Sequence, residues 1–129
     1  MLPMSDSRYR IHVSVRSQYL PDQSAPDDAT FSFAYTVTIR NDGKIPAQLI
    51  SRHWHIEDES GKVIEVSGLG VVGQQPLLAP GESFEYTSGS QIATPKGSMQ
   101  GEYFFVAEDG HRFEAPIPIF VLAMPRTLH

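Results

Sequence analysis

The chain has 129 residues, no cysteine and a formal net charge of −5, with ten lysines and arginines scattered along it. This length fits one domain, residues 1–129, whose first few residues are expected to be flexible. The composition excludes disulfides, cysteine zinc sites and thiol catalysis, and without a basic stripe nucleic acid is not an expected partner.

Apolar and polar residues alternate along the first half of the chain, which is the pattern of strands with one buried face. The alternation is clear from 11 to 15 and strongest from 31 to 39. One dry face and one wet face are typical of strands in antiparallel sheets. The residues expected to face the core are Ile11, Val13, Val15, Phe31, Phe33, Tyr35, Val37 and Ile39.

The next predicted strand carries the single tryptophan of the chain. Its alternation puts Ile50, Trp54 and Ile56 on one face, with His53 and His55 on the other. The acidic run Glu57, Asp58 and Glu59 follows, and with Ser60-Gly61 it predicts a solvated hairpin loop before a short strand over 62–66. Further on, Phe84 and Tyr86 are predicted to point inward from another strand.

The last two strands flank Asp109-Gly110, which is a strong signal for a two-residue hairpin turn. Pro116 and Pro118 lie in the final strand and cannot donate hydrogen bonds to a neighbour, so this strand is expected at a sheet edge or with a bulge. Its alternating residues, predicted to share a face, are Phe113, Ala115, Ile117, Ile119 and Val121.

These elements predict an all-β fold of seven or eight short antiparallel strands. No window of eleven or more residues has a helical period, and the chain shows no repeat and no interdomain linker. The pattern is that of an immunoglobulin or fibronectin type III-like β-sandwich, with Trp54 buried on the third strand. The fibronectin-like form is favoured because the cysteine pair of antibody domains is missing.

Three glycines in the segment GLGVVG, namely Gly68, Gly70 and Gly73, have the spacing of a dinucleotide-binding loop. Such a loop needs a helix whose N-terminus faces the phosphates, and here Pro76 and Pro80 follow within a few residues. No acidic residue stands at the position that would hold the ribose. The context therefore excludes a Rossmann fold and favours glycines that permit a tight corner at a strand end.

A loop that binds an anion through backbone amides, without a helix, is the alternative for the same glycines. The surrounding segment 63–95 contains three glutamates and no Lys, Arg or His, which opposes a pyrophosphate. A cation would have to be brought to the loop by the fold, and the candidates are Arg52, Lys62, Lys96 and Arg112.

His53 and His55 project from the same face of their strand and could share a metal ion, but a zinc site needs at least one more ligand. The expected state is a pair of half-exposed strand histidines with no metal site. No G-x-S-x-G segment is present, and no residues are predicted to be catalytic. We therefore expect a protein that is not an enzyme and has no cofactor.

Most of the chain resembles the ApaG family. The resemblance is carried by SRHW at 51–54, by GKVIEVSGLGVVGQQPLLAPGESFEYTSG at 61–89, by TPKGSMQGEYFFV at 94–106 and by DGHRFEAPIPIFVL at 109–122. The N-terminal third fits less sharply. In that family an aliphatic residue is expected at position 55, where this chain has His55.

The resemblance implies a small stand-alone bacterial domain with a fibronectin type III-like sandwich. It also implies kinship with a domain fused to F-box proteins and to a polymerase-interacting protein in eukaryotes, where the domain resembles a protein–protein module. The bacterial family is linked to cobalt resistance and magnesium efflux, and by gene neighbourhood to diadenosine tetraphosphate hydrolysis. The family's glycine motif falls on Gly68, Gly70 and Gly73, and no catalytic residues carry over.

Three functions follow as hypotheses. The preferred one is a non-enzymatic binding module with a protein partner, because exposed strand edges can accept another strand. The second is a small-ligand binder that takes pyrophosphate or a dinucleoside polyphosphate through Gly68–Gly73, and the third is a sensor of cobalt or magnesium. No segment approaches the ~20 apolar residues of a membrane span, and the opening residues do not form a signal peptide. A cytoplasmic protein with no membrane partner is therefore expected.

Overall fold

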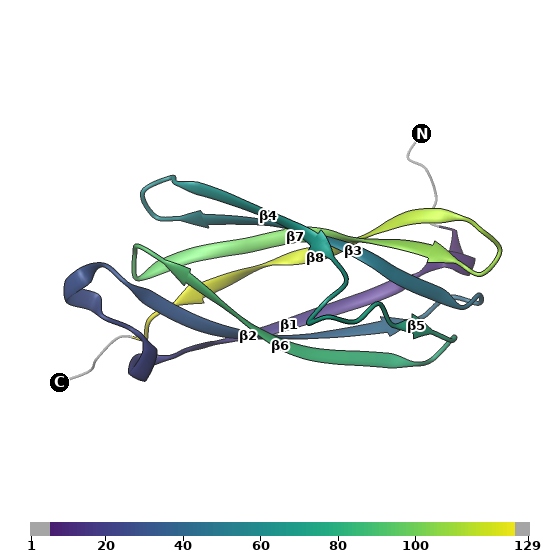
Figure 1. The fold of residues 1–129 in the computed structure, drawn as a ribbon, viewed down its shortest axis with the longest axis horizontal. Helices are drawn as coiled ribbons and strands as arrows, with labels where there is room; N and C mark the ends of the chain where they lie inside the picture. The colour runs from purple at the N-terminus through teal and green to yellow at the C-terminus, as the bar shows by residue number, and fades with distance from the viewer. Residues whose placement is uncertain (1–5, 126–129) are drawn as a thin grey trace.

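Eight strands arranged in two antiparallel sheets form the computed structural model, which describes residues 6–125 (Figure 1). The first residues, expected to be flexible, lie partly outside this range. Three one-turn 3-10 helices complete the described chain. The strands are β1 (Ile11–Tyr19), β2 (Phe31–Asn41), β3 (Ala47–Asp58), β4 (Val63–Leu69), β5 (Leu77–Leu78), β6 (Ser83–Ile92), β7 (Lys96–Ala107) and β8 (Arg112–Ala123), and the 3-10 helices are Ser7–Tyr9, Pro21–Gln23 and Pro26–Asp28.

One sheet has the order β1-β2-β6, and the other has the order β4-β3-β7-β8 with the short β5 paired to the start of β3. The two sheets stack as two layers (Figure 1). In immunoglobulin constant domains the fourth strand belongs to the same sheet as the first and second strands, whereas here β4 extends the other sheet. The predicted β-sandwich is confirmed, and this placement of β4 makes it the fibronectin type III-like form.

The alternation read from the sequence selects the buried face of each sheet. The five aromatic and aliphatic residues predicted inward on β2 are each at most 6 % exposed, and Trp54 is 2 % exposed. Trp54 lies edge-on to Tyr35 of the facing sheet, with 5.3 Å between the ring centroids. Since burial of apolar area is the main stabilising term in folding, this two-sided core holds the layers together.

Two bulges change the alternation where the sequence pattern predicted continuity. The pairing of β3 with β7 shifts between Leu49 and Ser51, so Ile50 does not share the face of Trp54 and Leu49 is buried instead. A second shift lies between the segments of β8 that pair with Met99 and Gly101 of β7, and it turns Ile119 and Val121 outward. These two side chains are 62 % and 61 % exposed, whereas Ala115 and Ile117 are buried, so the prediction that all of them share a face is wrong. The same strand does lie at a sheet edge, as its prolines indicate.

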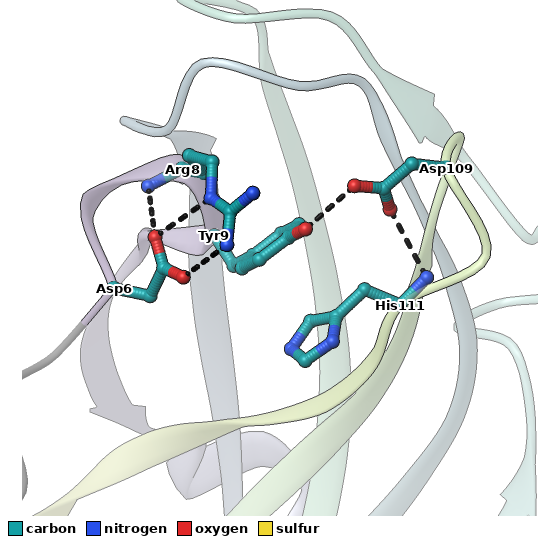
Figure 2. Close-up of polar contacts among 5 residues, drawn as sticks. All are labelled: Asp6, Arg8, Tyr9, Asp109 and His111. Atoms are coloured by element: carbon teal, nitrogen blue, oxygen red, sulfur yellow. Dashed lines mark hydrogen bonds and ion pairs between the residues drawn. The ribbon is translucent and has the colours of Figure 1, made fainter.

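The N-terminal segment is fixed to the β7–β8 hairpin at one end of the sandwich (Figure 2). The Tyr9 hydroxyl donates to Asp109 Oδ2 at 2.5 Å, and Asp109 Oδ1 accepts from the backbone N–H of His111 at 3.0 Å. The His111 ring stacks on Tyr9 with a centroid separation of 4.0 Å, while Arg8 pairs with Asp6. This cluster holds residues 6–9 against the hairpin. The hydrogen bond from Tyr9 lowers the pKa of Asp109.

Candidate binding site

The segment of the three glycines forms a tight corner between β4 and β5, which we call the glycine corner (residues 68–74). Val71 and Gln74 exchange both backbone hydrogen bonds, at 2.8 and 2.9 Å, around a two-residue turn. Gly73 in that turn has a φ of 79°, and Gly70 before it has a φ of 64°. Glycine is required at these positions because residues with a Cβ rarely adopt such values. At Gly70 a Cβ would in addition collide with the backbone of Gln74.

Gly68 serves a different purpose, since it makes room for the side chain of Arg52. A Cβ at Gly68 would lie 2.8 to 2.9 Å from three atoms of the Arg52 guanidinium group. That group in turn donates from Nη1 to the carbonyl oxygens of Leu69 and Gly70, at 3.1 and 2.8 Å. The glycine spacing thus follows from a corner folded around an arginine.

No helix follows the glycine corner, because the next element is the two-residue strand β5. The prediction that Pro76 and Pro80 prevent a dinucleotide-binding fold is therefore confirmed. Three of the corner's amides, those of Gly70, Val71 and Gln74, already donate to backbone carbonyl oxygens. These donors are not available to an anion unless the corner rearranges.

The fold nevertheless brings a cation to the corner, as an anion site would need. Arg52 lines a hollow of about 270 Å³ together with Tyr35, Tyr86, Ser88, Val72 and Gly73, and we call it the arginine pocket. Arg52 is half-buried, whereas every other Lys and Arg in the described range is exposed. It forms no ion pair with any residue of that range. Sequence reasoning named Arg52 as one of four candidate cations, and only the register of β3 with β4 selects it.

Two buried tyrosines underlie the arginine pocket. The hydroxyls of Tyr86 on β6 and Tyr103 on β7 form a hydrogen bond of 2.5 Å across the two sheets. Burial raises the pKa of Tyr86 to about 12, and burial also raises the pKa of Tyr103. Both hydroxyls therefore stay neutral at physiological pH, and the Arg52 charge has no internal phenolate to neutralise it.

The two long sides of the sandwich differ. On one side the edge strands β1 and β8 meet, and the Ser17 hydroxyl donates to the Val121 carbonyl oxygen at 2.8 Å. On the other side β4 has no counterpart in the three-stranded sheet, so the inward side chains of Ile64 and Val66 remain 40 % and 38 % exposed. Beside them lies β6, which pairs only with β2 in the described part of the chain.

We call this second side the open groove, bounded by the inner face of β4 (Ile64 and Val66) and by β6 (Ser83–Ile92). The arginine pocket forms one end of it, since its lining includes β6 residues and the end of β4. A second hollow of about 170 Å³ forms the other end, between Ile64 of β4 and Ile92 of β6. Both hollows therefore lie between the two sheets, along the same open side of the sandwich.

The acidic run 57–59 forms the predicted hairpin between β3 and β4, at the end of the groove away from Arg52. Asp58 is not solvated as expected, because it is only 9 % exposed. Its Oδ1 accepts from Ser60 N and Oγ and from Lys62 N, at 2.6 to 3.1 Å. The Ser60 hydrogen bond lowers the pKa of Asp58, so this carboxylate closes the turn and is not free for catalysis.

His53 and His55 project from the outer face of their strand, as predicted, and each contacts glutamates. Nδ1 of His53 lies 2.9 Å from Glu102 and its Nε2 lies 3.5 Å from Glu65, which also stands 3.3 Å from Nδ1 of His55. The Glu102 hydrogen bond raises the pKa of His53, while hydrogen bonds from His55 and His53 lower the pKa of Glu65. Within residues 6–125 no set of three or more His, Asp or Glu side chains is arranged to hold a metal ion.

The fold and the open groove define a two-layered β-sandwich of the fibronectin type III-like class, in which the edge strand β4 has no facing strand among the described residues. Comparison with known proteins then gives the family. The family model of the ApaG domain matches residues 21–107. The chain therefore belongs to the ApaG family.

Individual relatives agree over almost the whole length. Protein ApaG of Ralstonia nicotianae is 67% identical over 123 residues, which is 95% of this chain and 99% of that protein. The crystal structure of a Bordetella pertussis protein described as ApaA has a TM-score of 0.91 and 59% identity, and covers 94% of this chain and 98% of that one. A protein of Archaeoglobus fulgidus, with 10% identity and a TM-score of 0.54, shares the fold alone. In the described part of the chain, no helix has the length and apolar character needed to cross a membrane.

Proposed function

We propose that this protein is a non-enzymatic binding module that takes an extended segment of a partner protein into the open groove. The observation that carries the proposal is the inner face of β4, where no strand of the described residues faces the exposed side chains of Ile64 and Val66. Beside them, the outer edge of β6 pairs with no strand of residues 6–125. A strand added to β6 would make a fourth strand of the smaller sheet and would cover these two side chains. Strand addition of this kind gains main-chain hydrogen bonds along the edge and selectivity from alternate side chains.

The rest of the molecule is consistent with binding without catalysis. The polar clusters at Asp109, at Asp58 and at His53 each have a structural partner, in a hairpin, a turn and a pair of strands respectively. We place the activity in the bacterial cytoplasm as part of the same proposal. The connection of the family with cobalt resistance and magnesium efflux would then act through the bound partner.

A photo-crosslinking residue placed at position 66 or at position 63 tests the proposal in cells. Val66 and Val63 stand on opposite faces of β4 and are similarly exposed, at 38 % and 42 %, so they form a matched pair. We expect cross-links from position 66 to one extended segment of one protein, lost when Ile64→Lys places a charge in the groove. Equal cross-linking from both positions, or turnover of a substrate that Ile64→Lys leaves intact, would contradict the proposal.

A second candidate function is the binding of a free polyphosphate, and Arg52 at the glycine corner is the observation that favours it. The guanidinium group contacts Gly68 and Gly70, and it lines the same hollow as Gly73. Its Nε and Nη2 have no acceptor in the described residues. Titration with pyrophosphate and with diadenosine tetraphosphate, followed by backbone amide shifts, tests it. Saturable shifts confined to the glycine corner would favour this function, and unchanged spectra at millimolar ligand would end it.

A further inference from the structure

We propose that the arginine pocket binds a carboxylate of the partner segment, so that the groove selects an acidic residue with apolar residues two and four positions away from it. The inference rests on the proposed function, and it names the chemistry of the partner. It depends on the charge at one end of the groove and on the spacing of the side chains along it.

The unbalanced charge of Arg52 is the first argument. A half-buried guanidinium group is costly to keep out of water unless an anion accompanies it. Nη1 donates to two backbone carbonyl oxygens, and no carboxylate of residues 6–125 lies within ion-pair distance of the group. Nε and Nη2 remain as a pair of donors with the geometry that suits a carboxylate.

The hydroxyl groups around Arg52 are the second argument. Tyr35 lines the pocket, and its hydroxyl oxygen, which reaches the solvent there, forms no hydrogen bond with any residue that the structure describes. This hydroxyl can therefore donate to a ligand. Ser88 lines the same pocket from β6. A carboxylate on Arg52 would find these two hydroxyls as further donors.

Val72 supplies an independent observation at the same place. It occupies the first position of the two-residue turn with a φ of 42°, a conformation that branched residues rarely adopt. Asn or Gly is usual there, but Val72 holds an apolar side chain 54 % exposed at the rim of the pocket. Strain kept at an exposed apolar residue points to a contact outside the chain.

The spacing along the groove follows from the strand register. The inward pairs along β3 and β4 are Arg52 with Gly68, Trp54 with Val66, and Ile56 with Ile64. Each row is two residues from the next, or about 7 Å. An extended segment whose carboxylate contacts Arg52 would therefore place the side chains two and four residues away, on one side of it, over the exposed Val66 and Ile64. Both of these are apolar, and Lys62, which lines the hollow at the other end of the groove, lies beside the carboxylate of Asp58 there.

Selection of octapeptides from a random display library tests the inference on the full chain. Peptides that also bind Val66→Lys are removed, and the remaining ones are remade with their acidic residue changed to its amide. We expect the selected peptides to carry a carboxylate with apolar side chains two and four residues away. The amide form of each peptide should bind at least tenfold more weakly than the acidic form. With Arg52→Gln this ratio should fall below twofold.

Folding of the variants is checked separately, because Arg52 also holds the glycine corner. Arg52→Lys keeps the charge and should give an intermediate ratio between the affinities for the acidic and amide peptides. Ser88→Ala should bind the acidic peptide more weakly, while the Trp54 fluorescence of this variant stays like that of the wild type. The outcomes separate the two proposals. Peptides that bind the groove without an acidic residue would overturn the carboxylate inference alone. No enrichment over Val66→Lys would overturn the proposed function as well.

A free anion is the remaining outcome. If pyrophosphate binds more tightly than any selected peptide, depends on Arg52 and is unaffected by Val66→Lys, the arginine pocket serves a small ligand and the inference is wrong.

Discussion

Replacement of Val72 by Asn is predicted to stabilise the fold, because the left-handed turn position suits Asn better than Val. A branched residue in this region costs on the order of 1–2 kcal/mol, and Asn tolerates it. Val72 is 54 % exposed, so the substitution removes under half of the ~1.5 kcal/mol that full burial of a valine side chain contributes. The net expectation is a gain of about 0.5–1 kcal/mol.

For a domain of this size that gain corresponds to a rise in melting temperature of about 2–5 °C, which thermal unfolding followed by circular dichroism resolves. Val66→Asn is the matched control, since Val66 stands in an ordinary strand and the same change should lower the melting temperature. A Val72→Asn protein that melts at or below the wild-type temperature would show that the backbone of Val72 is not strained. Weaker peptide binding by the stabilised variant would link the strained conformation of Val72 to binding.

Three further results are expected. Tyr86→Phe should lower the free energy of unfolding in urea by about 1–3 kcal/mol, because it leaves the buried Tyr103 hydroxyl unpaired. The double variant with Phe at both positions should recover part of that loss, and additive losses would contradict the pairing. The pKa of His53 is raised by its hydrogen bond with Glu102, so this pairing stabilises the fold at pH values below the ordinary histidine pKa. The stabilisation is lost as pH rises through the pKa of His53 in the folded protein. Glu102→Gln should therefore reduce the change in melting temperature between pH 6 and 8. An unchanged pH profile would dismiss that contribution. Gly101→Ala should destabilise strongly, since a Cβ would strike the His53 carbonyl group, and a soluble, equally stable variant would be inconsistent with this register.

The fold follows from the sequence because apolar alternation and turn residues agree along most of the chain. Phe31 to Ile39 define a buried face without help from the rest, and Asp109-Gly110 marks the position of a hairpin. The predicted two-residue turn is wrong, because the loop between Ala107 and His111 has three residues and Gly110 takes its left-handed position. The bulges at Ile50 and before Phe120 could not be located, since an extra residue in a strand leaves no mark in composition. Each bulge reverses the faces beyond it, and that is why Ile119 and Val121 do not share the face of Ala115 and Ile117.

The candidate site was less accessible from sequence than the fold. The role of the glycine spacing could be predicted in outline, because Pro76 and Pro80 rule out a helix. The selection of Arg52 as the neighbouring cation could not, as it depends on the pairing of β3 with β4. The open groove was equally hidden, since it arises from the unequal number of strands in two sheets.

Hydrogen exchange of the backbone amides of β6, measured with and without a selected peptide, tests the central claim most directly. An extended segment paired to the free edge should slow exchange at alternate residues of Ser83–Ile92, and it should leave β1 unchanged because that strand already meets β8. Slowed exchange only at the glycine corner, or on the outer face that carries His53, with none along β6, would contradict the account.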